Sequence, residues 1–359
     1  MEGSCPAVAN QRHFLLRWAA MDSEIETTDL GPLGVLHLKR LWSRLTLRSA
    51  NQNKQTNEWL SDRLVIDGLG LALEETIQYL GRTAPTYEQF EQWILERNGG
   101  RIEPLRLERI NATVSGAEYS AELKATLREI EHSTPVLTPA DLLFWETNGY
   151  VILHDAVELE NCRAAEAAIW ESLGMDPSDP GTWYKGNDHG IMRQFFHHPA
   201  LAANRRSPRI HKAFAQIWGT ADLWMTVDRV SFNPPERDGW KFPGPWLHWD
   251  TTLLPPVPFS VSGILYLTAT DAQQGAFTCV PGFHLRIDDW LRSLPPDADP
   301  RRQNLAELGA TPLAGRAGDL IIWHEALPHG SRPNHATRPR IVQYLTMQPA
   351  KREHNPVWR

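Results

Sequence analysis

Apolar residues recur at helical spacing through the first third of the chain. The stretches that show this period are 71–81, 86–100 and 121–130. An apolar residue at every third or fourth position is typical of an α-helix with one buried face. In the second stretch Thr86 and Gln89 predict a capping box, and Gly99 ends the pattern. Residues 46–57 are polar and predict a loop, so we expect 1–135 to be a mostly helical N-terminal region.

A domain boundary is predicted at residue 135, within the polar stretch 131–138. Thr138 is an N-cap residue followed by Pro139, a residue favoured in the first turn of a helix. Gly149 ends this helix, and an apolar run that predicts a short strand follows it. A further helix is expected at 160–174, where Gly174 ends the apolar period.

From residue 224 onward, short alternating runs separated by Pro and Gly replace the helical period. The runs are Trp224–Phe232, Ser262–Thr268, Phe277–Val280, Asp319–Trp323 and Ile341–Met347. Such spacing favours a β-sandwich or jelly roll. The fold class expected for 136–359 is α+β, with a double-stranded β-helix (jelly roll, cupin-like) as its core and helices flanking it. Residues 285–312 form a long insertion of the kind that serves as a lid or binding loop.

The candidate chemistry lies in this second region, in the motif His248-Trp249-Asp250. In an extended strand the side chains of residues i and i+2 point the same way, so His248 and Asp250 can converge on one ion. His329 is the best candidate for a third ligand, and two histidines with one carboxylate form the facial triad that binds Fe(II). Arg340 follows eleven residues later, and a buried guanidinium there matches the far carboxylate of a dicarboxylate cosubstrate.

Four segments around these residues resemble the phytanoyl-CoA dioxygenase family of Fe(II)/2-oxoglutarate oxygenases. They read LTPADLLFWETNGYVIL, GPWLHWD, GILYLTATDAQQGAFTCVPGFH and GDLIIWHEALPHGSRPNHATRPR. The resemblance covers roughly residues 137–350 and does not reach 1–130. A His-x-Asp motif alone is a weak signal, but the downstream His-Gly-Ser and the Arg follow in the family's order and spacing.

The resemblance implies a bound Fe(II), 2-oxoglutarate as cosubstrate, and O2. It implies hydroxylation of a C–H bond of a small molecule, such as an acyl compound or a secondary metabolite. A carboxylate at Asp250 favours this outcome over halogenation, because related halogenases have a small residue there. Ser331 would contact the cosubstrate with Arg340, and Tyr266 falls where relatives often have an aromatic residue lining its pocket. Asn233 is a departure, since relatives often have Lys at that position.

Several residues near these motifs have competing interpretations. His324 is an alternative third ligand, but its place at the end of a predicted strand favours a structural role. Arg338 is the alternative to Arg340, and the Pro that follows it favours a surface position. Tyr266 is equally well explained as a core residue. The other residues set aside, as structural or surface residues, are His284, His189, His197, His198, Arg205, Arg206 and Arg209.

The net charge of −7 argues against nucleic acid as a partner. Cys5, Cys162 and Cys279 are widely spaced and predict neither a disulfide framework nor a metal knuckle. We find no apolar run of signal-peptide or membrane-spanning character, so a cytoplasmic protein is expected.

Two other functions compete with the dioxygenase hypothesis. The β domain could be a metal-binding oxidase that does not use 2-oxoglutarate, or a binding module without activity, and Arg340 argues against both. Residues 1–130 could be an interaction or homodimerisation module rather than a substrate domain, and their apolar helical faces fit either role.

Overall fold

The computed structural model describes residues 25–46, 58–185, 190–355 and 357. The chain forms two compact units, Met1–Val65 with Ile77–Glu118, and Ile66–Thr76 with Tyr119–Arg359. The loop expected at 46–57 lies outside the described residues except for Thr46, which ends a helix. Among the helices of the described part, none has the length and apolar character needed to cross a bilayer.

The first unit is helical in its described part, as expected. It contains α2 (Leu38–Thr46), α5 (Tyr87–Arg97), α6 (Pro104–Ser115) and the larger parts of α3 (Trp59–Gly68) and α4 (Leu73–Thr83). The capping box is confirmed, because the Thr86 hydroxyl accepts from the Gln89 N–H and the Gln89 side chain accepts from the Thr86 N–H. Phe90, Trp93 and Ile94 form the buried stripe of α5.

The helices of the second unit begin before the boundary expected at residue 135. They are α7 (Ala121–His132), α8 (Pro139–Asn148), α9 (Leu159–Leu173), α10 (Pro199–Arg205), α11 (Pro208–Trp218) and α12 (Ile287–Ser293). Helix α7 packs on α11 and so belongs to this unit, and the division into domains at residue 135 stays a prediction. Thr138 caps α8 as expected, and Gly149 ends it in the left-handed region at φ 72°.

A six-stranded sheet forms the centre of the second unit, with strand order β1-β8-β5-β10-β4-β2. These strands are β1 (Tyr150–Leu153), β8 (Leu320–His324), β5 (Val261–Tyr266), β10 (Arg340–Tyr344), β4 (Val230–Asn233) and β2 (Met192–Arg193). All of its pairings are antiparallel. The run expected at Trp224–Phe232 is divided, since residues 226–229 separate β4 from β3 (Trp224–Met225), which pairs with β11 (Met347–Gln348). The unit therefore combines helices with sheets.

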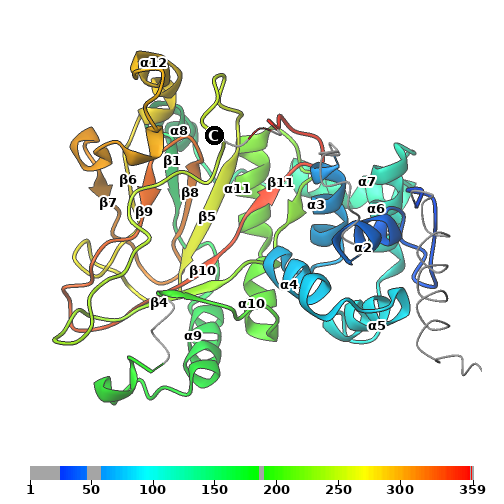
Figure 1. The fold of residues 1–359 in the computed structure, drawn as a ribbon, viewed down its shortest axis with the longest axis horizontal. Helices are drawn as coiled ribbons and strands as arrows, with labels where there is room; N and C mark the ends of the chain where they lie inside the picture. The colour runs from blue at the N-terminus through cyan, green and yellow to red at the C-terminus, as the bar shows by residue number, and fades with distance from the viewer. Residues whose placement is uncertain (1–24, 47–57, 186–189, 356, 358–359) are drawn as a thin grey trace, which may run out of the picture. The chain divides into compact units, whose positions relative to one another are not determined.

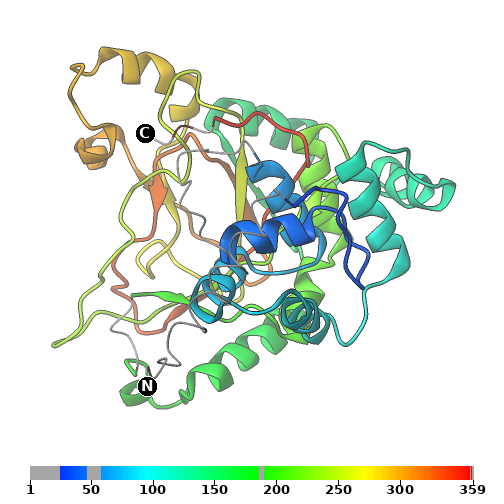
Figure 2. The same cartoon turned by 45° about the vertical axis from the view of Figure 1, so that its right-hand side comes forward.

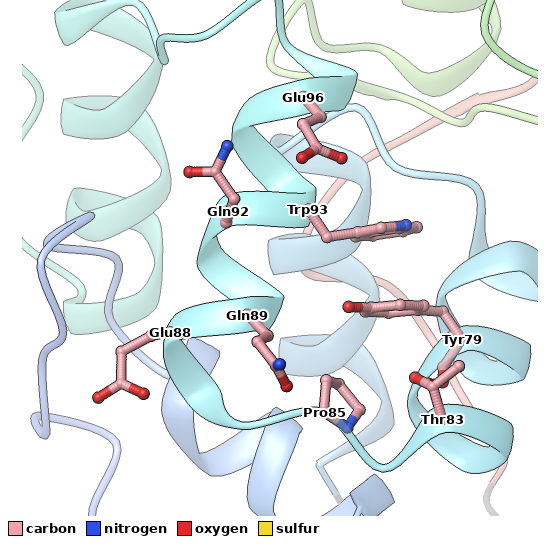
Figure 3. Close-up of a pocket in the computed structure, with 8 residues that line it drawn as sticks. All are labelled: Tyr79, Thr83, Pro85, Glu88, Gln89, Gln92, Trp93 and Glu96. Atoms are coloured by element: carbon pink, nitrogen blue, oxygen red, sulfur yellow. Dashed lines mark hydrogen bonds between the residues drawn. The ribbon is translucent and has the colours of Figure 1, made fainter.

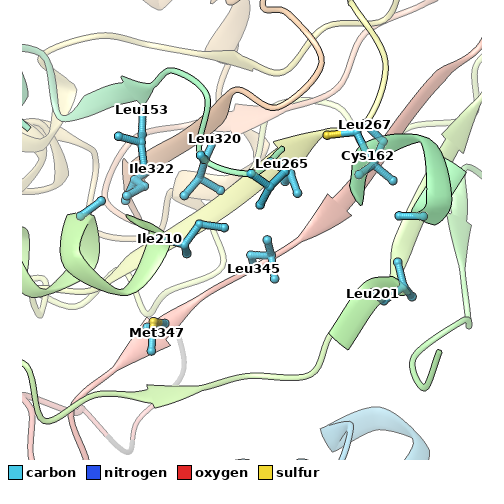
Figure 4. Packing of buried hydrophobic residues seen from close by; sticks show 14 of the residues in the cluster. Leu153, Cys162, Leu201, Ile210, Leu265, Leu267, Leu320, Ile322, Leu345 and Met347 are labelled. Carbon is cyan, nitrogen blue, oxygen red and sulfur yellow. The ribbon is translucent and has the colours of Figure 1, made fainter. Parts of the chain in front are cut away.

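A smaller sheet of three strands, β7 (Thr311–Pro312), β6 (Thr278–Cys279) and β9 (His329–Gly330), completes the second unit. Two hydrophobic cores lie on the opposite faces of the six-stranded sheet. Leu265 of β5 belongs to the first core, with residues of α9, α10 and α11, while its neighbours Ile264 and Tyr266 belong to the second core, with residues around β6. Figure 4 shows Leu265 and Leu320 near Ile210 of α11, within the first core.

Successive strand residues alternate between the two faces of a sheet, so Ile264 and Tyr266 point away from the first core. Cys279 of the small sheet belongs to the same second core, so this core lies on the side of the small sheet. The small sheet and α11 lie on opposite sides of β5 and β8 (Figure 1). The insertion expected at 285–312 contains α12 and two 3₁₀ turns, Pro300–Arg302 and Leu305–Leu308. Helix α12 lies at one end of the sheets in both views (Figures 1 and 2).

Candidate metal centre

The structure brings the three predicted metal ligands together. His248, Asp250 and His329 each offer a ligand atom, and these atoms lie within 4.8 Å of one another. Nε2 of His329 is 3.1 Å from Oδ2 of Asp250, and Nε2 of His248 is 3.5 Å from Oδ1. Two atoms that bind one ion at about 2 Å lie about 3 Å apart, so this spacing fits a shared metal ion.

Backbone carbonyls orient both imidazole rings. Nδ1 of His248 lies 2.6 Å from the Trp246 carbonyl oxygen, and Nδ1 of His329 lies 3.0 Å from that of Leu327. A carbonyl oxygen only accepts, so each Nδ1 must carry the hydrogen. In the neutral ring the lone pair then belongs to Nε2, which is the tautomer a metal ligand needs. In the protonated ring Nε2 also carries a hydrogen, which it can donate to Asp250.

The charges within the group favour an ionised carboxylate. Burial by itself would raise the pKa of Asp250, but hydrogen bonds and the charges of the two imidazoles hold it far below its usual range. Burial lowers the pKa of His248, and the contact with Asp250 outweighs this and raises it. Asp250 is therefore an anion at neutral pH and can offset the charge of a cation.

The backbone that carries His248 differs from the strand expected there. His248 makes one isolated antiparallel bridge, in which its N–H and carbonyl pair with those of His329 at 2.8 and 2.9 Å. The chain then bends at Asp250 instead of continuing as a strand. The two histidines are thus placed opposite each other by backbone pairing, while the position of Asp250 depends on other contacts.

Gly330 explains why a glycine follows the distal histidine. A Cβ atom at this position would lie 2.5 Å from the carbonyl oxygen of Trp246 and 2.7 Å from its carbonyl carbon. Both are backbone atoms of the segment that leads into His248, so they cannot move aside as a flexible side chain would. The glycine lets the segments of the two histidines lie in contact.

We predict that Gly330→Ala separates these segments and weakens metal binding by about tenfold or more, the range for lost support of metal ligands. Metal titration of the purified variant measures this. Gly81→Ala is the matched control, because nothing lies within 4 Å of a Cβ at Gly81 of α4. Unchanged metal affinity in Gly330→Ala would contradict the role assigned to this glycine.

Arg340 is fully buried at the start of β10 and faces the second core with Val342. Its Nη1 donates to the Ser331 hydroxyl at 3.0 Å, and its Nη2 donates to the Ser231 hydroxyl at 2.7 Å. Among the described residues no carboxylate forms an ion pair with it, and its Nε has no hydrogen-bond partner. A buried charge without a counter-ion is costly, so the arrangement fits an anionic ligand.

Ser231 is a further contact of Arg340 that the sequence motifs did not predict. It is fully buried in β4, where it lies opposite Val342 of β10. The sequence signal was a serine between Val230 and Phe232, which join the first core. A polar residue in such an alternating pattern points to the opposite face, but only the pairing of β4 with β10 shows that it contacts Arg340.

Tyr266 and Asn233 both have contacts with backbone atoms. The Tyr266 hydroxyl donates to the Leu313 carbonyl at 2.7 Å and accepts from the Phe277 N–H at 3.0 Å. Its contact with the cosubstrate stays a prediction. Asn233, where relatives often have Lys, is fully buried and donates to the Arg332 carbonyl at 3.1 Å, so it supports the segment that follows Ser331.

The alternative candidates have other partners. His324 stacks on Trp145, and its Nδ1 accepts from the Ala326 N–H. Burial, with the nearby His284, lowers the pKa of His324 to about 3, so it is a neutral structural residue at neutral pH. Arg338 is exposed. Nε2 of His284 contacts the Glu146 carbonyl at 3.1 Å, which agrees with the structural role expected.

The histidines and arginines set aside also have partners. His197 pairs with Glu75 at 2.9 Å, and His198 caps α10, whereas His189 lies outside the described residues. Arg205 donates to the carbonyls of Phe196 and Asp228. Exposed Arg209 donates to the backbone of residues 154 and 155, and Arg206 is exposed.

A second group of ligand-type residues lies in the first unit. His37, Glu58 and Asp62 are close enough to hold a metal ion, and Nε2 of His37 is 2.8 Å from Asp62. However, Arg40 and Arg44 both pair with Glu58, and Arg44 also pairs with Asp62. Two guanidinium cations already balance these carboxylates, so we interpret the group as a structural ion-pair network.

The first unit also has an open hollow of about 820 Å³ between α4 and α5 (Figure 3). The rings of Tyr79 and Trp93 stack beside it with centroids 4.7 Å apart, and the Arg97 guanidinium lies over Trp93 at 4.4 Å. The aromatic faces therefore contact each other and the arginine. None of the residues predicted for the site lines this hollow.

Comparison with known proteins matches residues 145–342, more than half of the chain, to the model of the phytanoyl-CoA dioxygenase (PhyH) family. A Dictyostelium discoideum protein provisionally named phytanoyl-CoA dioxygenase is 20% identical over 57% of this chain and 74% of its own length. The ectoine dioxygenase of Bordetella parapertussis is 23% identical over 59% of this chain and 75% of its own. HygX from Streptomyces hygroscopicus, solved with nickel and 2-oxoglutarate bound, is 17% identical, with a TM-score of 0.43 over 60% of this chain and 88% of its own.

The family match includes His248, Asp250, His329 and Arg340. The resemblance noted from the sequence motifs and the match to the family model agree over this region. This chain belongs to the phytanoyl-CoA dioxygenase family, and it is an Fe(II)- and 2-oxoglutarate-dependent dioxygenase.

Proposed function

We propose that His248, Asp250 and His329 are the protein ligands of the Fe(II), and that the enzyme hydroxylates a C–H bond of a small molecule. The observation that carries the site assignment is the buried Arg340 without a carboxylate partner among the described residues. Arg340 donates a hydrogen bond to Ser331, which is two residues from His329. A cation thus lies next to the segment that would supply a metal ligand.

Arg340, Ser331 and Ser231 together would hold the far carboxylate of 2-oxoglutarate. Each serine hydroxyl accepts a hydrogen bond from the guanidinium. A hydroxyl that accepts through its oxygen still has its own hydrogen to donate. The cation and the two hydroxyl donors therefore meet the needs of a carboxylate, which only accepts.

The two sheets that face the second core would be the two faces of a jelly roll. The small sheet contributes His329, and the six-stranded sheet contributes Arg340. Residues from both, such as Cys279 and Val342, meet in the second core. This arrangement would hold the ligand set and the cosubstrate anchor in one rigid frame.

The metal, with 2-oxoglutarate and O2, supplies the oxidising chemistry when bound, and the chain positions the reactants and excludes water. His248, Asp250 and His329 would hold the metal and leave it positions for other ligands. The exposed fraction of the side chain is 59% for Asp250 but 3% for His329. A small molecule therefore reaches the site from the side of Asp250, whereas the His329 side is closed by the core.

The test is succinate formation by the full chain supplied with Fe(II), 2-oxoglutarate and a library of small metabolites. We expect succinate to form only when 2-oxoglutarate is present, and a hydroxylated product to accompany it for the true substrate. Oxidation of a metabolite without 2-oxoglutarate would instead support an oxidase. Metal binding with neither activity would support a binding module.

A second prediction concerns the carboxylate ligand. Asp250→Gly removes this ligand, so we expect loss of hydroxylation, weaker metal retention and an extra open position that azide or chloride can occupy. Iron content, azide binding followed by absorption spectroscopy, and product formation are measured together, because loss of metal alone would also abolish activity. Full hydroxylation by Asp250→Gly, or a chlorinated product from the wild type, would contradict the ligand assignment.

A homodimer through the N-terminal helices is a separate proposal, supported by exposed apolar side chains such as Trp59 and Ile77. Light scattering on the full chain measures its mass in solution. The variant Ile77→Lys, with a charge on this surface, would shift a dimer to monomer. A monomeric wild type would contradict the proposal.

A further inference from the structure

The segment around Asp250 has an unusual local environment. The single bridge between His248 and His329 is not extended into a ladder, and the chain bends at Asp250. The two residues beside it are nevertheless buried, with exposed fractions of 2% for Trp249 and 6% for Thr251. Contacts other than strand pairing must therefore satisfy the backbone carbonyls of these two residues.

Arg301 makes both of those contacts. Its Nη1 donates to the Trp249 carbonyl and its Nη2 donates to the Thr251 carbonyl, each at 2.7 Å. One guanidinium thus bridges the residues immediately before and after Asp250. The planar fork of arginine holds its two donors at a fixed separation, so the pair of hydrogen bonds also fixes the distance between the two carbonyls.

Arg301 is itself held in place. It belongs to the 3₁₀ turn Pro300–Arg302 in the 285–312 segment, and the Asp299 side chain accepts from its N–H at 2.9 Å. The Trp249 indole donates to the Ala326 carbonyl at 2.9 Å and packs near Trp290 of α12, which belongs to the same 285–312 segment. The backbone at Asp250 is therefore held by Ala326 and by two parts of the 285–312 segment, Arg301 and Trp290.

We propose that Arg301 is a positioning residue for Asp250, and that by bridging the carbonyls of Trp249 and Thr251 it sets the direction in which this carboxylate meets the metal. The inference rests on the proposed function, because it requires Asp250 to be a metal ligand. It gives the 285–312 segment a part in building the metal centre. Lysine cannot replace the arginine, since one ammonium cannot span two carbonyls in a fixed geometry.

The experiment uses the metal-free full chain titrated with Co(II), whose visible absorption reports the number and geometry of its ligands. We expect Arg301→Ala to raise the Kd for Co(II) by about tenfold or more, as for the loss of other contacts that orient metal ligands. The visible spectrum of the bound ion should change as well, and Arg301→Lys should restore the wild-type spectrum at most in part. Arg302→Ala is the matched control, because the neighbouring Arg302 side chain is 86% exposed.

If Arg301 only stabilised the fold, Arg301→Ala would lower the unfolding temperature of the metal-free protein. The Co(II) spectrum and Kd of the folded fraction would then stay unchanged. That result would overturn the proposal, as would a wild-type spectrum and Kd in Arg301→Lys. If Arg301→Ala does not fold, Arg301→Gln takes its place, since a single amide can reach only one of the two carbonyls. A wild-type spectrum and Kd in Arg301→Gln would then overturn the proposal.

The ligand variants separate this inference from the proposed function. If Co(II) binding by the wild type does not depend on His329 and Asp250, the site assignment itself is wrong. If it depends on both residues but is unchanged in Arg301→Ala and Arg301→Gln, only the positioning role fails.

Discussion

A His329→Ala enzyme is expected to lose Fe(II) binding and all 2-oxoglutarate-dependent turnover. His329 is one of three groups that can reach a shared ion, and its side chain is only 3% exposed. A water molecule could take the place of the imidazole at the metal, but it is too small to fill the space that the ring occupies in the core. His248→Ala and Asp250→Ala should have the same effect, and iron content after desalting together with succinate formation measures both losses.

His324→Ala is the control, because it removes a half-buried histidine that lies outside the proposed ligand group. His324 stacks on Trp145 and is outside the ligand group. We expect this variant to retain metal and activity, with a lower unfolding temperature from the lost packing. An inactive His324→Ala beside an active His329→Ala would show that the distal ligand is assigned to the wrong histidine.

Arg340→Ala should raise the KM for 2-oxoglutarate by tenfold or more while the metal stays bound. Hydrogen bonds to a charged group contribute about 1.5–3 kcal/mol each, and about 1.4 kcal/mol corresponds to a factor of ten. Succinate formation at a series of 2-oxoglutarate concentrations measures the change. Arg338→Ala is the matched control, since this arginine is exposed two residues earlier, and an unchanged KM in Arg340→Ala would overturn the anchor role.

The burial of Arg340 adds a second readout, obtained without cosubstrate. An unpaired buried cation costs free energy, and an apolar side chain of similar length removes that cost. Arg340→Met should therefore unfold, without 2-oxoglutarate, at a temperature equal to or above that of the wild type. The added stability from 2-oxoglutarate, which raises the unfolding temperature of the wild type by mass action, should be lost. A large loss of stability in the absence of 2-oxoglutarate would show that Arg340 is mainly structural.

The sequence determined those features that depend on neighbours along the chain. The capping box at Thr86, the N-cap at Thr138 and the helix end at Gly149 follow from local hydrogen bonding and backbone conformation. The proposed ligand set also came from the sequence, because His-x-Asp, His-Gly-Ser and Arg follow in an order that resembles the family's. The short alternating runs predicted β-strands because side chains along a strand alternate between its two faces.

The tertiary structure decided the features that depend on pairing between distant segments. The contact of Ser231 with Arg340 arises from the register of β4 on β10, and the need for glycine at 330 arises from the backbone of Trp246 beside it. The expected strand at His248 is a single bridge followed by a bend, which Arg301 holds from about fifty residues away in the sequence. Hydrophobic periodicity records which face of a segment is buried, but not which segment covers that face, so these contacts could not be predicted from the sequence alone.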